Sequence, residues 1–211
     1  MTIAISDITK LIVPEVGGCL DARIDIEVIR AVRTLCEKSR VWKQGFETTV
    51  STPEGPEFDI DLPNGTDLVS VDYVTSIGLD LEATTEYELN RDVPYWRTHA
   101  GTPSHFYTDF RTKLIGLYPT PSDSFDLQYE VTLKPGVSAT ELPDFFAEQF
   151  VEVIIDGALS RLLAMNSVPW MNHSEADRRK ADFNAGIAMA RDKAIRGVAS
   201  HQSDMHGDPL L

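Results

Sequence analysis

The chain has 211 residues, of which 42% are hydrophobic and 25% are charged. This length suits one sizeable core, or a main domain with an inserted lobe, and the composition excludes a disordered, collagen-like or coiled-coil chain. Nineteen basic and 33 acidic side chains give a formal net charge of -14 at pH 7. This charge disfavours proteins that grip nucleic acid, although it permits a surface past which DNA slides.

Cysteine usage and the N-terminus indicate a cellular compartment. The two cysteines are Cys19 and Cys36, and no basic and apolar leader opens the sequence. We therefore expect synthesis in a reducing cytoplasm, without a disulfide framework. No apolar run approaches the roughly 18 residues that a membrane-spanning helix needs, so no membrane partner is expected.

Residues 1–41 are predicted to contribute an N-terminal segment and one helix. The stretch 2–19 contains Pro14 and the pair Gly17-Gly18, which favour an ordered loop. From Ala22, apolar residues recur at steps of three and four, with Asp21 placed as an N-cap. This spacing predicts an amphipathic helix that ends near Ser39.

Residues 42–140 are predicted to form an antiparallel β lobe. Runs of alternating or β-branched residues lie between turn signals such as Pro63-Asn64-Gly65 and Gly101-Thr102-Pro103. The predicted strands are 46–51, 58–62, 68–77, 86–90, 105–109, 113–118 and 125–133.

Residues 141–197 are predicted to form a helical hairpin. Pro143 suits a first helical turn, and an apolar stripe runs from Phe146 towards Asn166. The pair Gly157-Ala158 within that stripe predicts close contact with another helix. A second helix is expected between an N-cap at Ser174 and a stop at Gly197.

These elements predict an α+β fold, in which a helical base of three main helices carries the inserted antiparallel β lobe. The terminal helices must bury their apolar stripes against each other. The residues expected in the core of this base are Ile26, Ile29, Phe150, Ile154, Ala158 and Ile187.

Signatures of catalysis are absent from the sequence. It has no phosphate-binding Gly-rich loop, no Gly-x-Ser-x-Gly motif, no paired histidines on one helix face and no Cys-x-x-Cys motif. We therefore predict no catalytic residue, no metal and no cofactor. One alternative stays open: His99 and His105 flank a turn, and with nearby carboxylates they would suit a small metal-dependent hydrolase.

Some residues are candidates for contacts rather than chemistry. Trp96 and Trp170 each lie among turn residues, where a large ring either locks a loop onto the core or meets a partner. Arg178-Arg179-Lys180 is the one basic run, and it spreads around more than half of a helix. It is interpreted as a solvated or interfacial patch rather than a DNA clamp.

An ordered set of segments resembles the head-to-tail adaptor proteins of tailed phages, of the gatekeeper or tail-tubular type. The set spans about Leu20 to Ile195, and its order along the chain carries the resemblance. Its segments are Leu20-Asp21-Ala22, Ala31-Val32-Arg33, 36–42, Asp61-Leu62-Pro63, Gly101-Thr102-Pro103, 117–121, 129–135, Leu142-Pro143, Gly157-Ala158-Leu159, Leu163, Met165, Pro169-Trp170 and 183–187.

The resemblance implies a non-enzymatic structural protein of the virion, located at the head-tail junction. Such adaptors form a dodecameric ring beneath the portal, extend the DNA channel and give the tail or nozzle its docking surface. The implied partners are the portal protein, a nozzle or tail-tube protein, further copies of the chain, and genomic DNA that passes without specific binding. A head-completion or tail-tube protein of a long-tailed phage is the alternative.

The resemblance also implies where the portal is bound. Residues 198–211 form a polar tail with an apolar end, and similar adaptors clasp the portal with a C-terminal arm. The predicted portal-binding residues of this tail are His201, Met205, Pro209, Leu210 and Leu211. Arg178, Arg179 and Lys180 are the second candidates, on the helical base.

Overall fold

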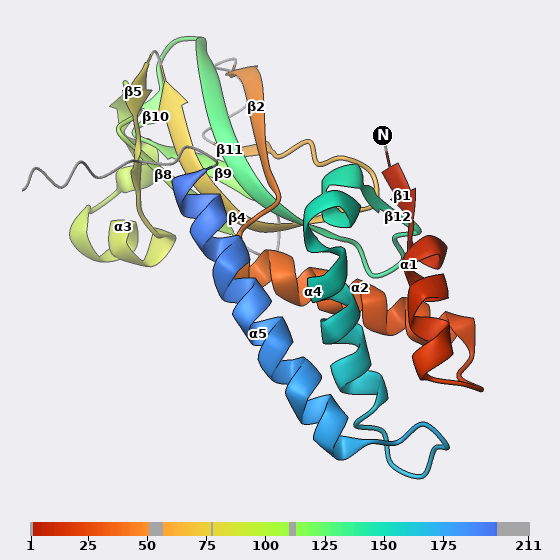
Figure 1. Cartoon of the computed structure of the whole chain (residues 1–211). Coiled ribbons are helices and arrows are strands. Elements are labelled where there is room, and N and C mark those ends of the chain that lie inside the picture. Colours follow the sequence, from red (N-terminus) through yellow and green to blue (C-terminus); the bar gives the residue numbers. More distant parts are fainter. Residues whose placement is uncertain (1, 51–56, 77, 110–112, 198–211) are drawn as a thin grey trace, which may run out of the picture.

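The computed structural model describes residues 2–50, 57–76, 78–109 and 113–197. The helices α1, α2, α4 and α5 gather at one end of the molecule, with β1 and β12 beside them, whereas the other strands and α3 lie at the other end (Figure 1). The α+β class predicted from the sequence is confirmed. Within these described ranges, no helix is long and apolar enough to cross a membrane.

The helical end is built from segments near both ends of the chain. The long helices α4 and α5 lie beside each other, and α2 crosses them (Figure 1). The helices and 3-10 turns are α1 (Ile5–Ile12), η1 (Val13–Glu15), α2 (Asp21–Ser39), α3 (Glu86–Asp92), η3 (Trp96–Thr98), α4 (Asp144–Leu162) and α5 (His173–Arg196).

One large apolar core joins α1, α2, α4 and α5. At its centre, Gly157 of α4 lies against Phe183 of α5 and Ala31 of α2. A Cβ atom added at Gly157 would lie 2.7 Å from the Phe183 ring and 2.9 Å from the Ala31 Cβ. The absence of a side chain therefore lets three helices meet at one point, as the pair Gly157-Ala158 predicted.

The strands form two four-stranded sheets and one short pairing, β7 with β10, in the lobe, and β1 pairs with β12 beside the helices. One sheet has the order β2-β11-β4-β5 and the other β3-β9-β8-β6. The strands are β1 (Thr2–Ala4), β2 (Lys43–Val50), β3 (Glu57–Asp59), β4 (Thr66–Ser76), β5 (Leu79–Asp80), β6 (Glu82–Ala83), β7 (Ala100–Gly101), β8 (His105–Asp109), β9 (Leu114–Tyr118), β10 (Thr120–Pro121), β11 (Phe125–Pro135) and β12 (Glu141–Pro143).

Strand β11 organises the lobe. It pairs antiparallel with β2 on one side and with β4 on the other, and the register with β4 shifts twice along its length. Both sheets bury side chains in one core, to which β11 contributes Leu127 and Leu133 and β9 contributes Ile115 and Leu117. The sheets are therefore two layers around a second hydrophobic core.

Lobe and base meet at contacts of several kinds. Trp42 packs against both cores, and its ring meets the Phe146 ring edge-on at 5.6 Å. Arg33 of α2 donates to Asp67 Oδ2 at 2.8 Å, and Lys134 of β11 donates to Glu37 Oε1 at 2.6 Å. Packing and charge thus hold the lobe against α2.

The prediction of a loop over residues 2–19 is wrong. Strand β1 pairs antiparallel with β12, and α1 and η1 follow it. Ile5, Ile8 and Ile12 are 3%, 0% and 0% exposed, so a helical stripe of only two turns buries almost completely in the base. Pro14 and Gly17-Gly18 do not prevent this helix, because they lie after its end at Ile12.

The prediction of a strand over 86–90 is also wrong, because these residues belong to α3. Thr85 and Glu88 form a capping box: Glu88 N donates to Thr85 Oγ1 at 3.1 Å, and Thr85 N donates to Glu88 Oε2 at 3.0 Å. The spacing Thr-x-x-Glu is a recognised start of a helix. In this short segment the capping box favours a helix, and it outweighs the alternating apolar residues that favour a strand.

Helix boundaries and one core residue also differ from the predictions. The N-cap of α2 is Leu20 rather than Asp21, and that of α5 is Asn172, whose side chain accepts from Glu175 N at 3.2 Å. Pro143 precedes α4 at the N-cap position, and α4 ends at Leu162. Ile26 is 44% exposed, whereas the other five residues predicted for the base core are buried.

We predict that Gly157→Val destabilises the protein by about 1–3 kcal/mol, since the new side chain overpacks the junction of α2, α4 and α5. Gly45→Val is the matched control, because no atom lies within 4 Å of a Cβ built at Gly45. Chemical denaturation of both variants measures the difference. Equal denaturation midpoints for the two variants would contradict close packing at Gly157.

Candidate functional site

The basic run on α5 is divided among three environments. Arg178 is exposed and pairs with Glu175 and Asp182 of its own helix. Arg179 is only 18% exposed and reaches two other elements: its Nη1 donates to Asp156 Oδ1 of α4 at 2.7 Å, and its Nη2 donates to Glu15 Oε2 of η1 at 2.9 Å. Lys180 is exposed. The run therefore does not form one basic patch.

The pKa of Glu175 shows how these charges are satisfied. Hydrogen bonds, first from Arg178 and then from Arg179, lower the pKa of Glu175 from 4.5 to about 2. Because the pKa of Glu175 is lower in the folded than in the unfolded state, the ionised carboxylate stabilises the fold at pH values above 4.5. This stabilisation is lost as the pH falls from 4.5 towards about 2. Arg178 and Arg179 therefore act mainly on the carboxylates of their own chain.

Lys180 belongs to a groove along the base, which we call the α2/α5 groove. It runs beside α5, with the end of α2 and the end of α4 on its other side, as three adjoining hollows of about 390, 460 and 680 Å³. Lys38 lines all three hollows. The cationic side chains that line it are Lys38, Arg40, Lys43, Arg161, Lys180 and Arg191, and its carboxylates are Glu37, Asp72, Asp177 and Asp192.

Trp96 is 4% exposed and locks the loop that follows α3. Its ring packs edge-on against Tyr107 at 5.4 Å, and its Nε1 donates to Asn90 Oδ1 at 2.9 Å. Trp170 is half-buried against the helical core near Gly18. Its buried Nε1 has no partner in the described part of the chain. Both tryptophans thus make contacts within the chain, and the partner role stays a prediction.

His99 and His105 both lie close to Tyr118. His99 Nδ1 is 3.3 Å from the Tyr118 hydroxyl, and the His105 ring is 6.0 Å from the Tyr118 ring. The Nε2 atom of His105 lies 3.6 Å from Glu82 Oε2. Among the described residues, no group of three or more His, Cys, Asp or Glu side chains gathers as a metal site would require.

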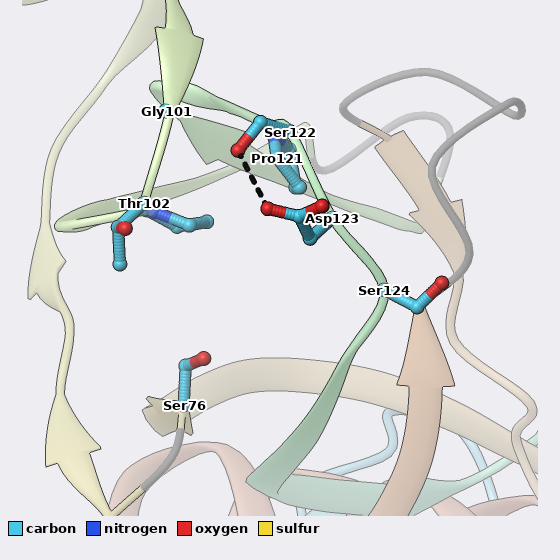
Figure 2. Close-up of a pocket in the computed structure, with 8 residues that line it drawn as sticks. Ser76, Gly101, Thr102, Pro121, Ser122, Asp123 and Ser124 are labelled. Carbon is cyan, nitrogen blue, oxygen red and sulfur yellow. Dashed lines mark hydrogen bonds between the residues drawn. The ribbon is translucent and has the colours of Figure 1, made fainter.

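A small pocket in the lobe, of about 120 Å³, lies between strands β4, β7 and β10 and the turns beside them. Figure 2 shows hydroxyl side chains around it, with Ser122 donating to Asp123 at 3.3 Å across the wall. Asp123 is its one carboxylate, and no histidine, cysteine or basic side chain lines it. The described lining therefore holds no histidine or lysine that could activate a serine hydroxyl.

The predicted portal-binding tail lies outside the described residues. Helix α5 ends at Arg196, and Gly197 follows with a φ of 66°. His201, Met205, Pro209, Leu210 and Leu211 all come after this point in the sequence.

A comparison with protein families shows to which kind of protein this chain belongs. The family model described as SU10 adaptor protein matches residues 20–206. The chain belongs to the SU10 adaptor protein family. It is a phage head-to-tail adaptor, a structural and non-enzymatic kind of protein. No sequence among the curated proteins matches the chain.

The sequence analysis did not predict two features of this adaptor. The role of Arg179 as a tie between α5, α4 and η1 needs the tertiary fold, because Glu15 lies far away in the chain. The α2/α5 groove combines single basic residues from three helices. The only sequence signal was Lys38 and Lys180 on predicted helices, and nothing in that pattern shows that they share a groove.

We predict that Arg179→Ala destabilises the fold by about 1–3 kcal/mol, because it leaves the mostly buried Asp156 carboxylate without its ionic partner. Arg178→Ala is the control, since Arg178 is exposed and ties no second element. Thermal unfolding of both variants at neutral pH makes the comparison. A loss at Arg178 as large as that at Arg179 would argue against the special role of Arg179.

Proposed function

We propose that this adaptor forms a ring beneath the portal, extends the DNA channel and provides the docking surface for the tail or nozzle. The observation that carries the proposal is the family match over residues 20–206, which covers α2, the whole lobe, α4 and α5. Base and lobe therefore belong to the adaptor as one unit. The resemblance implies a dodecamer located at the head-tail junction of the virion.

The architecture supports a role in assembly. The base has its own buried core, and the lobe has a second core connected to it through Trp42. A subunit with two ends can hold a partner at each end without rebuilding its core. We propose that the base lies towards the portal and that the lobe points towards the tail.

The net charge supports passage of DNA without retention. A formal charge of -14 opposes the accumulation of phosphate groups on the protein. The single basic run is partly neutralised by Glu175, Asp182, Asp156 and Glu15. A channel wall with this balance lets DNA slide, because it lacks the dense cationic surface of a DNA clamp.

The portal contact is proposed to lie in residues 198–211. This segment follows α5 directly, and it ends in Pro209-Leu210-Leu211, an apolar group after a polar spacer. A segment that orders only on its partner can lie along a crevice between portal subunits without contributing to the core of the free chain. His201 and Met205 lie in the spacer and would add contacts along its length.

We predict that a chain ending at Gly197 folds normally and fails to attach to the portal. Among the described residues the helical core ends at Ala190, so we expect the thermal midpoint to stay the same. Co-sedimentation with purified portal rings measures attachment of the truncated and full chains. Portals decorated at full occupancy by the truncated chain would move the docking surface to the base.

We also predict that the free protein does not retard random duplex DNA at physiological salt, since counterion release from so acidic a protein is small. An electrophoretic shift assay over a range of protein concentrations tests this. Binding at micromolar or lower concentration would remove the interpretation as a channel wall.

A further inference from the structure

The α2/α5 groove is cationic although the chain as a whole is strongly acidic. Lys38, Lys180 and Arg191 are exposed, and in the described ranges none of them forms an ion pair. Arg161 is half-buried and donates to Gly157 O and Thr34 Oγ1 instead of a carboxylate. Burial lowers the pKa of Arg161. Carboxylates also line the groove, but Lys38, Lys180 and Arg191 make no ion pair with them, and unpaired cations favour an acidic partner.

The groove also has the shape and the apolar surface of a protein contact. Its hollows follow one after another along α5, from Lys180 past Arg191 to Ile195. Phe183 and Ile187 contribute to its walls, and Ile195 at its end is 73% exposed. An elongated groove with apolar walls and charged rims suits an amphipathic helix of a partner.

Helix α4 of the same subunit carries an acidic face that could bind such a groove. This face lies on the side of α4 that points away from α2 and α5. Glu148 and Glu152 are exposed one turn apart, and neither has a partner in the part of the chain described by the structure. At about 100° per residue, Glu148 points about 180° away from Gly157, which contacts α2 and α5.

The same geometry separates the acidic face from the groove itself. Ser160 and Arg161 of α4 line the groove. They follow Glu148 by 12 and 13 positions, which places them about 120° and 140° from it around the helix axis. The two surfaces therefore face in nearly opposite directions across the base, so one copy cannot satisfy its own groove with its own α4.

We propose that the α2/α5 groove of one copy receives the Glu148 and Glu152 face of α4 from a second copy. This inference rests on the proposed ring and names the surfaces that build it. The contact is heterologous, because each copy offers a cationic groove on one side and an acidic helix face on the other. Repetition of such a contact gives a closed ring when the rotation between copies closes.

Charge complementarity favours a second copy over nucleic acid as the occupant. Glu37, Asp72, Asp177 and Asp192 lie among the lining residues, so a phosphate backbone that follows the whole groove would meet carboxylates in each hollow. A helix face with two separate carboxylates places its charge at discrete points. Opposite charges across such an interface speed the encounter and fix the register, whereas like charges oppose the wrong pairing.

The experiment uses two full-length variants, each with one face reversed. The groove variant is Lys38→Glu with Lys180→Glu, and the helix variant is Glu148→Lys with Glu152→Lys. Each variant places like charges across every interface, so we expect its self-association to weaken by at least about tenfold. Sedimentation velocity and native mass spectrometry, alone and on purified portal rings, measure the assembly.

Mixing the two variants separates a true interface from a folding defect. The groove variant has two acidic faces and the helix variant has two basic faces, so alternation of the two restores opposite charges at every contact. We expect assemblies with equal numbers of both variants, close to wild-type in stability. Asp80→Lys and Arg91→Glu, which reverse exposed charges on the lobe, are the controls and should leave assembly unchanged.

The outcomes distinguish this interface from the proposed function. Wild-type rings that both reversals leave intact, or variants that mixing does not rescue, overturn the interface while the ring beneath the portal stands. Wild-type assembly through these faces without attachment to portals overturns the proposed function alone. Wild-type chains that stay monomeric, both in solution and with portal present, contradict both.

Discussion

The close approach of α2, α4 and α5 at Gly157 is the constraint on which the rest of the molecule depends. With only hydrogen at this position, the Phe183 ring and the Ala31 methyl group both reach the α4 backbone. This approach fixes the angles between the helices, and hence the width of the α2/α5 groove and the direction of the Glu148 face. It also places Asp156 where Arg179 can reach it. Surface and core are therefore set by the same contact.

The strongly periodic parts of this fold could be predicted from its sequence. The helix over 21–39 and the pair of C-terminal helices have long apolar stripes, and most of the lobe strands are separated by clear turn residues. Residues 2–12 escaped prediction because their stripe is short, and it becomes meaningful only when α2 and α4 cover it. In the segment 86–90, a local cap outweighed the alternation of side chains.

The candidate surfaces were harder to predict than the fold. A run such as Arg178-Arg179-Lys180 shows its charge in the sequence, but its meaning depends on which carboxylates the fold brings near. Glu15 and Asp156 neutralise Arg179, whereas Lys180 lies in a groove to which α2, α4 and a later turn of α5 also contribute cations. Pairing between distant charges is a property of tertiary structure, so spacing along the chain cannot give it.

The position of β11 has a mechanical consequence. This strand of 11 residues is hydrogen-bonded on both sides, and its C-terminal end leads through β12 into α4. A pull along β11 between the lobe and the base loads its hydrogen bonds to β2 and β4 in shear, all at once, rather than opening them one after another. The connection between the two cores is consequently strongest along the direction in which β11 runs.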